Sequence, residues 1–293
     1  MNSITVKAYA KINLGLDVLR KRSDGYHDVC MIMQSLDLHD KITINRTQTE
    51  GIVIRTNLFY LPNNQDNLVH KAATLFLQTL GTQEGLTIEL EKHIPVAAGL
   101  AGGSSDAAAT LIGLNQLYQT GLSLTELQKL GVKLGADVPY CLMLGTALSE
   151  GIGEVLTPLT PMPSCTILMV KPDISVSTKY VYENLKLTES IVHPDIEAMK
   201  TALVNKDLYT LTKTMDNILQ TVTVKDYPII SDIKEKMKEL GALTSLMSGS
   251  GPTVFGIFQN RELAKKALFY FRKHQHYGKQ VFLSTPYWPK AEG

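Results

Sequence analysis

Cysteine is scarce in this sequence, and its few cysteines form neither a disulfide pattern nor a zinc-binding pattern. The chain has three, Cys30, Cys141 and Cys165, which are odd in number, widely spaced and without a C-x-x-C pair. Small disulfide scaffolds and cysteine-based zinc sites depend on paired or closely spaced cysteines. We therefore expect no disulfide framework and no structural zinc.

Excess charge and long apolar runs are also lacking. Lysine and arginine total 29 against 28 aspartates and glutamates, a net charge of +1 that gives no basic field for nucleic acid. No apolar stretch reaches the roughly 18 residues that a membrane span requires. The amino-terminal residues lack the apolar core of a secretory signal. We expect a cytoplasmic protein without nucleic-acid or membrane partners.

The chain does have the length and apolar content for two domains. It contains 293 residues, of which 44% are hydrophobic, as is ordinary for a globular protein. Residues 156–163 hold three prolines, the clearest linker signature in the sequence. We predict a first domain over residues 1–158 and a second over 159–293.

A glycine-rich loop at residues 95–105 lies between a predicted strand and a predicted helix. Residues 86–90 alternate apolar and polar side chains, and the apolar positions after residue 106 recur at helical spacing. Gly99, Gly102 and Gly103 allow the backbone to approach a ligand closely. A helix N-terminus favours an anion, and phosphate is the expected one.

The loop matches neither common nucleotide motif. Its glycines read G-x-x-G-G, so the dinucleotide pattern is absent, and no Gly-Lys-Ser/Thr follows. The segment Ser104–Asp106 offers cap chemistry, so a tight turn with capping serines is the alternative interpretation. A second glycine-serine loop at 248–252 is by itself a plain turn. Two such loops together favour a phosphorylated small molecule.

Residues 4–18 alternate without a break and predict one long antiparallel strand, bent or split near Gly15. Lys11 and Asn13 share its polar face, where an exposed strand lysine is the simpler interpretation of Lys11. A hairpin turn follows, and Tyr26 and His27 come directly after it. Such a pair can stack on a planar base, but it more often packs and caps a strand.

Asp137 is a lone carboxylate in an apolar stretch, residues 135–145, that we interpret as a loop. Pro139 is expected to hold Val138 extended. A carboxylate in such surroundings is either a structural cap or a functional group with a constrained protonation state. Further elements are expected as strands at 31–38, 41–46, 52–55, 166–170 and 253–258, and as helices at 68–80, 125–134, 195–204, 208–219, 229–240 and 262–273.

Three segments together resemble the motifs of the GHMP kinases: residues 11–14, 95–105 and 248–254. Within that superfamily, residues 10–14, 24–27 and 134–139 resemble the branch that uses ATP to phosphorylate the 2-hydroxyl of a cytidylated methylerythritol in the non-mevalonate isoprenoid route. Another small-molecule kinase of the superfamily, of mevalonate or homoserine type, is one alternative. A non-catalytic nucleotide-binding module is the other.

The resemblance implies a two-domain α+β fold. The first domain would be similar to the second domain of ribosomal protein S5, with a left-handed βαβ crossover that handedness rules do not predict. The second would be ferredoxin-like. ATP and Mg²⁺ are the implied cofactors, and the protein would be a monomer or a weak homodimer.

The resemblance also implies roles for individual residues. Asp137 would accept the substrate hydroxyl proton, with Lys11 close by to keep it ionised and to neutralise phosphoryl charge. Ser104 or Ser105 would lie near Mg²⁺, and Ser105 is the residue we assign to the metal. The ATP phosphates would be cradled by Pro95, Val96, Ala97, Ala98, Gly99, Leu100, Ala101, Gly102, Gly103, Ser104 and Ser105.

On the substrate side, the resemblance assigns the cytosine to Tyr26 and His27. Asn13 and Thr178 would hold the erythritol end. An aromatic residue of the second domain would close over the base. Tyr182 is the predicted residue, and Tyr180 is the alternative.

Overall fold

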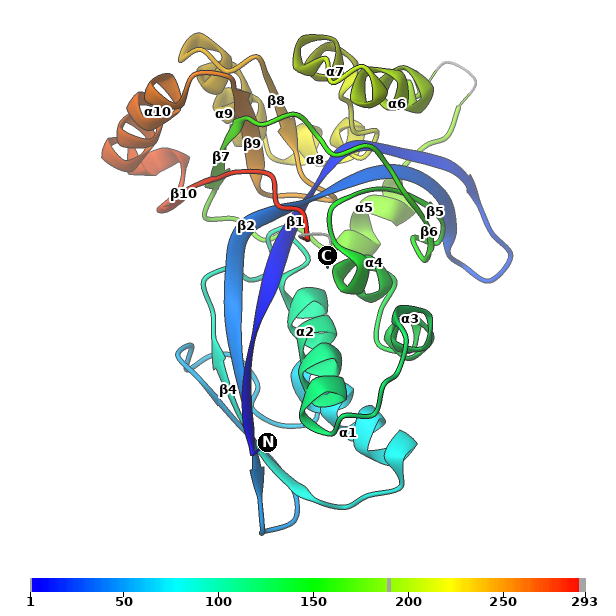
Figure 1. Cartoon of the computed structure of the whole chain (residues 1–293). Helices are drawn as coiled ribbons and strands as arrows, with labels where there is room; N and C mark the ends of the chain where they lie inside the picture. The colour runs from blue at the N-terminus through cyan, green and yellow to red at the C-terminus, as the bar shows by residue number, and fades with distance from the viewer. Residues whose placement is uncertain (1, 189–190, 290–293) are drawn as a thin grey trace. The chain divides into compact units, whose positions relative to one another are not determined.

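The computed structural model describes residues 2–188 and 191–289, and the chain forms two compact units. The first unit comprises Met1–Ala10, Leu38–Val96 and Ala101–Met143, and the second comprises Lys11–Asp37, Ala97–Leu100 and Leu144–Gly293. Figure 1 shows helices and strands in both. The predicted division at residue 158 stays a prediction.

Two long strands, β1 (Ser3–Lys21) and β2 (His27–Thr47), pair with each other and contribute to both units. The predicted first strand is confirmed, and it continues through Gly15 without a break. The predicted turn is also present, with the N–H of Gly25 donating to the carbonyl of Arg22 at 3.3 Å. The two strands expected at 31–38 and 41–46 are instead one. Asp40 does not end a strand but lies fully buried inside β2.

In the first unit, β4 (Gly85–Glu91) lies between β2, its antiparallel neighbour, and β3 (Ile52–Thr56), its parallel neighbour. The crossover helix α1 (Leu68–Leu80) has the predicted bounds. Asn67 caps its N-terminus, and Gly81 ends it with a φ of 68°. The handedness of this βαβ unit stays a prediction.

Helix α2 (Gly102–Leu117) follows the glycine loop, but the predicted capping by its serines is wrong. The N-cap is Ala101, which makes no side-chain cap hydrogen bond. Ser105 and Asp106 are buried within the first turns of α2, where their side chains bind other parts of the first unit. Helix α3 (Leu124–Val132) has a capping box between Ser123 and Glu126 that we did not predict.

The segment at 135–145 is not a loop throughout, because helix α4 occupies Val138–Met143. Asp137 immediately precedes this helix, and its carbonyl accepts the N–H of Cys141 at 3.0 Å. Val138 is helical rather than extended. A proline in the first turn of a helix is tolerated, because the N–H groups there have no intrahelical acceptor. Val138 and Tyr140 are fully buried.

The second unit contains two sets of strands. The first half of β2 pairs with β5 (Thr146–Gly151), which pairs in turn with β6 (Val155–Pro158). The proline-rich linker therefore begins inside a strand. The second set is antiparallel, in the order β10-β7-β9-β8, with β7 at Thr166–Lys171, β8 at Thr244–Met247, β9 at Val254–Phe258 and β10 at Gln280–Ser284.

Between these strands run α5 (Thr178–Asn184), α6 (Ile196–Val204), α7 (Leu208–Thr214), α8 (Gln220–Asp226), α9 (Ile229–Glu239) and α10 (Arg261–Lys273). Helix α9 precedes β8, and α10 connects β9 to β10. This βαββαβ connectivity is the ferredoxin-like arrangement, as predicted.

One expectation for the second unit is wrong. The helix predicted at 208–219 ends at Thr214, and a separate helix, α8, follows Leu219. Asn217 forms a β-bridge with Leu16, so its backbone leaves the helical path. Strands β8 and β10 were not predicted. In the part of the chain that the structure describes, no helix is long and apolar enough to span a membrane.

Candidate functional site

Lys11 and Asn13 are buried side by side on β1 in the second unit. Their exposed fractions are 5% and 0%, so Lys11 is not an exposed strand lysine. The Nζ of Lys11 donates to the Oδ1 of Asn13 at 2.8 Å. The Nδ2 of Asn13 contacts the Sδ of Met31 at 3.4 Å. A buried cation is held here with its direction fixed by a neighbouring amide.

Part of the glycine loop, Ala97–Leu100, packs against this strand and against the second glycine-serine loop. The backbone N–H of Lys11 donates to the carbonyl of Leu100 at 3.1 Å. Ser248 Oγ donates to the carbonyl of Gly99 at 2.9 Å. A Cβ on Gly99 would lie 2.2 Å from the carbonyl oxygen of Ser248, so only glycine fits. Residues from each of the three segments singled out in the sequence are thus brought together within the second unit.

The backbone of the loop is unusual in its torsion angles. Ala97, Gly99 and Ala101 have φ values of 50°, 75° and 56°. Left-handed conformations at alternate positions are typical of main-chain nests, in which N–H groups converge on an anion. Non-glycine residues adopt them at a cost and concentrate at functional sites. The loop is therefore suited to hold phosphate oxygens.

The second glycine-serine loop is fixed by Asn217, a residue that the sequence did not single out. Its Nδ2 donates to the carbonyls of Met247 and Gly249, both at 2.8 Å. Its Oδ1 accepts the N–H of Leu219 at 3.0 Å, and the side chain is 1% exposed. The only sequence signal for this role is the polar pair Asp216-Asn217, which falls inside the helix predicted at 208–219.

Two of the predicted aromatic residues lie together. The rings of His27 and Tyr182 are 5.2 Å apart between centroids, at an angle of 40°. Burial, and to a lesser degree the charge of Lys21, lowers the pKa of His27 below its usual value. Tyr180 instead faces Asp226, which raises the pKa of its phenol. Tyr26 is 59% exposed.

Thr178 lies at the second glycine-serine loop. Its Oγ1 is 2.8 Å from the Oγ of Ser250, a buried residue. Thr178 begins helix α5, which also carries Tyr182. One short helix thus supplies two of the five predicted substrate residues.

The two serines of the glycine loop differ in their surroundings. Ser105 is 1% exposed, and its Oγ donates to the carbonyl of Tyr9 at 2.6 Å. Ser104 is only partly buried. Among the described residues, no cluster of three or more histidine, cysteine or acidic side chains is arranged to hold a metal ion.

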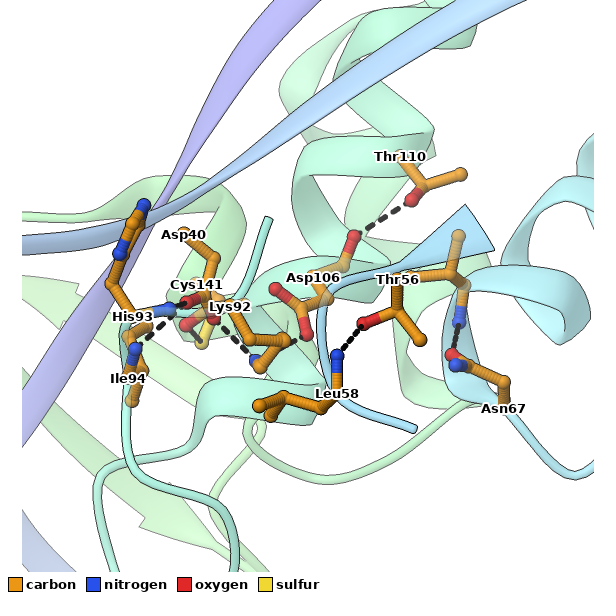
Figure 2. A network of polar contacts seen from close by, with 12 residues as sticks. Asp40, Thr56, Leu58, Asn67, Lys92, His93, Ile94, Asp106, Thr110 and Cys141 are labelled. Atoms are coloured by element: carbon orange, nitrogen blue, oxygen red, sulfur yellow. Dashed lines mark hydrogen bonds and ion pairs between the residues drawn. The ribbon is translucent and has the colours of Figure 1, made fainter. Parts of the chain in front are cut away.

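A buried ionic cluster in the first unit was missed by sequence reasoning. Figure 2 shows Lys92 between Asp40 and Asp106, with ion pairs to both, the one to Asp106 at 2.6 Å. These two carboxylates raise the pKa of Lys92, although burial opposes the shift. Burial raises the pKa of Asp106, although the charge of Lys92 opposes the shift. No sequence signal joins these residues, because Asp40 lies 52 positions before Lys92 and Asp106 is expected from the sequence only to cap a helix.

The predicted base and its lysine partner belong to different units. Asp137 is in the first and Lys11 is in the second. Their approach to each other stays a prediction.

Comparisons with known proteins agree with the resemblance seen in the sequence. Residues 67–145 match the GHMP kinases N terminal domain, and residues 199–276 match the GHMP kinases C terminal domain. The chain is 59% identical to the 4-diphosphocytidyl-2-C-methyl-D-erythritol kinase of Lachnoclostridium phytofermentans over 97% of both chains. It is 50% identical to the enzyme of that name from Lachnospira eligens, over 99% of this chain and 100% of the relative.

A solved structure is similar over nearly the whole length. The crystal structure of a 4-(cytidine 5'-diphospho)-2C-methyl-D-erythritol kinase superposes with a TM-score of 0.83 and 31% identity. The match covers 98% of this chain and 100% of the other. With both family domains present and relatives this similar along the full chain, the protein belongs to the GHMP kinases, in the family of the 4-diphosphocytidyl-2-C-methyl-D-erythritol kinases.

Proposed function

We propose that this chain is an ATP-dependent kinase that phosphorylates the 2-hydroxyl of 4-diphosphocytidyl-2-C-methyl-D-erythritol, giving the 2-phosphate and ADP. The observation that carries the proposal is the 59% identity to a relative with that name over 97% of both chains. Hydrogen bonds also support it, because they join residues from the three motifs of the resemblance. The glycine loop accepts one from the backbone of Lys11 and one from the hydroxyl of Ser248. No comparison favours a mevalonate- or homoserine-type kinase or a non-catalytic module.

The proposed chemistry uses positioning and charge rather than a covalent intermediate. The glycine loop would hold the ATP phosphates through its main-chain N–H groups. Lys11 would offset the negative charge of the transferring phosphoryl group, with its ammonium oriented by Asn13. Asp137 would accept the proton of the attacking hydroxyl as a general base.

Magnesium belongs to the proposal as well. When bound, Mg²⁺ would neutralise charge on the ATP phosphates. The metal was assigned to Ser105, but that hydroxyl is buried and donates to Tyr9. Ser104 is the more exposed of the two serines at the start of α2. We therefore propose Ser104 as the serine that faces the metal.

The cytidylated substrate would bind on the second unit. Its cytosine would lie against Tyr26 and His27, with Tyr182 as the closing aromatic. The contact between the His27 and Tyr182 rings favours Tyr182 over Tyr180 for that role. Asn13 and Thr178 would hold the erythritol hydroxyls.

The proposal also includes a cytoplasmic location and a monomeric or weakly dimeric state. Light scattering of the purified protein tests the oligomeric state.

The test is a substrate panel. The purified chain is incubated with ATP, Mg²⁺ and the cytidylated erythritol, and ADP release is followed in a coupled assay. Phosphorus NMR then identifies the phosphorylated position. We expect a 2-phosphate product and no turnover of mevalonate or homoserine. Turnover of either of those, or no turnover of any acceptor, would refute the proposal.

A further inference from the structure

The buried cluster in Figure 2 touches both ends of the glycine loop in the first unit. We propose that Asp40 and Lys92 are positioning residues that hold the segments before and after this loop in the geometry needed for ATP. The inference rests on the proposed function, because it assigns the loop to ATP.

The segment before the loop is held by Asp40. Its Oδ1 accepts the backbone N–H groups of His93 and Ile94, the second at 2.7 Å, and its Oδ2 pairs with the ammonium of Lys92. The Lys92 backbone is held from the other side by Asn57. The Lys92 N–H donates to Asn57 Oδ1 at 2.8 Å, and Asn57 Nδ2 donates to the Lys92 carbonyl at 3.1 Å. The chain thus arrives at the loop with its path fixed on two sides.

The segment after the loop is held by the Lys92 ammonium. Its Nζ donates to Oδ2 of Asp106, in the second turn of α2, at 2.6 Å. It also lies 3.3 Å from where a Cβ on Gly102, the first residue of α2, would stand. The ammonium therefore packs beneath the start of the helix that would face the phosphates. One side chain connects the two ends of the loop.

Neighbouring residues provide a natural comparison. Lys41 and Glu91, each adjacent in sequence to a cluster member, also pair between β2 and β4, at 3.0 Å. That pair is exposed, with about half of each side chain accessible to solvent. A buried ion pair contributes little net stability, because the cost of removing its charges from water offsets their attraction. Contact with both ends of the loop is what distinguishes the buried cluster.

The two carboxylates of the cluster are not equivalent. Asp40 uses both oxygens as acceptors. Asp106 uses one, because its Oδ1 is buried and has no hydrogen-bond partner among the described residues. In Asp40→Asn the new NH₂ group replaces one of these acceptors, so it must face a hydrogen-bond donor and a hydrogen bond is lost. In Asp106→Asn the amide oxygen can keep Lys92, and the NH₂ group takes the position of the unpaired oxygen.

The experiment compares Asp40→Asn, Lys92→Met and Asp106→Asn with the surface controls Glu91→Gln and Lys41→Met. Each variant is assayed for the KM of ATP and the KM of the cytidylated erythritol, for ATP binding by calorimetry, and for melting temperature. We expect Asp40→Asn and Lys92→Met to weaken the binding of ATP on the order of 10-fold or more. This is the effect expected when a buried hydrogen bond to a charged group is lost. Asp106→Asn and both controls should stay within about threefold of the wild type. The KM of the cytidylated substrate should be unchanged throughout.

Three results would overturn the inference: unchanged ATP binding in folded Asp40→Asn, equal losses in Asp40→Asn and Asp106→Asn, or a parallel rise in both KM values. If Asp40→Asn does not fold, Asn57→Ala removes only the outer support of Lys92. It should raise the KM of ATP several-fold at a near-normal melting temperature, and an unchanged KM would also overturn the inference.

If the wild type binds ATP but turns over no acceptor, the proposed substrate is wrong. The calorimetric comparison of ATP binding among the variants still decides the positioning role.

Discussion

Ser248 donates a hydrogen bond from its hydroxyl to the carbonyl of Gly99, a residue 149 positions earlier in the chain. The contact joins two glycine-containing loops that are far apart in the sequence. At Gly99 the φ is 75°, and a Cβ would lie 2.2 Å from the Ser248 carbonyl oxygen. The conformation of the proposed phosphate-binding loop therefore depends on this one position lacking a side chain.

Gly99→Ala should abolish most of the kinase activity. The methyl group can be accommodated only if the two loops separate, so we expect kcat/KM to fall on the order of 100-fold. Gly121→Ala is the matched control, since Gly121 has a φ of 68° but nothing within 4 Å of the added Cβ. That variant should lose about 1 kcal/mol of stability through backbone strain and keep its activity. Steady-state kinetics and thermal melting check both, and equal activity in the two variants would contradict the argument.

Asp137→Ala should lower kcat on the order of 10² or more while leaving the melting temperature nearly unchanged, because a general base contributes to the rate and not to the fold. The reciprocal control is Glu126→Ala, which removes the capping box of α3. It should cost about 1 kcal/mol of stability and leave kcat alone. A fully active, folded Asp137→Ala would exclude Asp137 as the base.

Substrate affinity should be insensitive to pH until the solution becomes distinctly acidic. Burial lowers the pKa of His27 below 6.5, so its imidazole stays neutral through the neutral range. As pH falls below 6.5, the unfolded chain takes up a proton before the folded protein does, and the folded state loses stability through that window. We expect affinity for the cytidylated substrate to be constant from about pH 8 to about 6.5 and to decline only below that range. Calorimetric titrations across pH test this, and NMR titration of His27 showing a pKa of 6.5 or above would contradict it.

Asn217→Asp should destabilise the second unit and disable the second glycine-serine loop. A carboxylate cannot donate to the carbonyls of Met247 and Gly249, which would then be left unpaired in a buried site. We expect a loss of about 2–4 kcal/mol, measured by denaturant unfolding. The same substitution at exposed Asn205, the C-cap of α6, should change stability by less than about 0.5 kcal/mol. Equal effects at the two positions would show that the amide donors of Asn217 are unimportant.

Much of the fold was predictable because local signals agreed with tertiary structure. Helix α1 has the predicted bounds, since the side chain of Asn67 is a strong start signal and the left-handed backbone of Gly81 is a strong stop signal. Helix α4 was missed because Pro139 indicated an extended residue before it, whereas position within the first helical turn decides the outcome. The strands expected at 31–38 and 41–46 leave Asp40 between them, because its burial within one long strand depends on partners far away in the sequence.

Some residues of the candidate site could likewise be predicted from the sequence, and others could not. Lys11, Asn13 and the two glycine loops carry residue patterns that a sequence reader can find. Asn217 and the Lys92 cluster do not, because their importance comes from hydrogen bonds to backbone atoms of distant segments. Such contacts leave no periodicity and no spacing rule.

Strand β1 is buried on both faces from Ala10 to Val18, with Lys11, Asn13 and Asp17 on one side and aliphatic residues on the other. Substitutions there disturb one position at a time. Loss or gain of a single codon would exchange the two sides for every residue beyond it, driving an ammonium and a carboxylate toward hydrocarbon. The length of this stretch is therefore under tighter constraint than its composition.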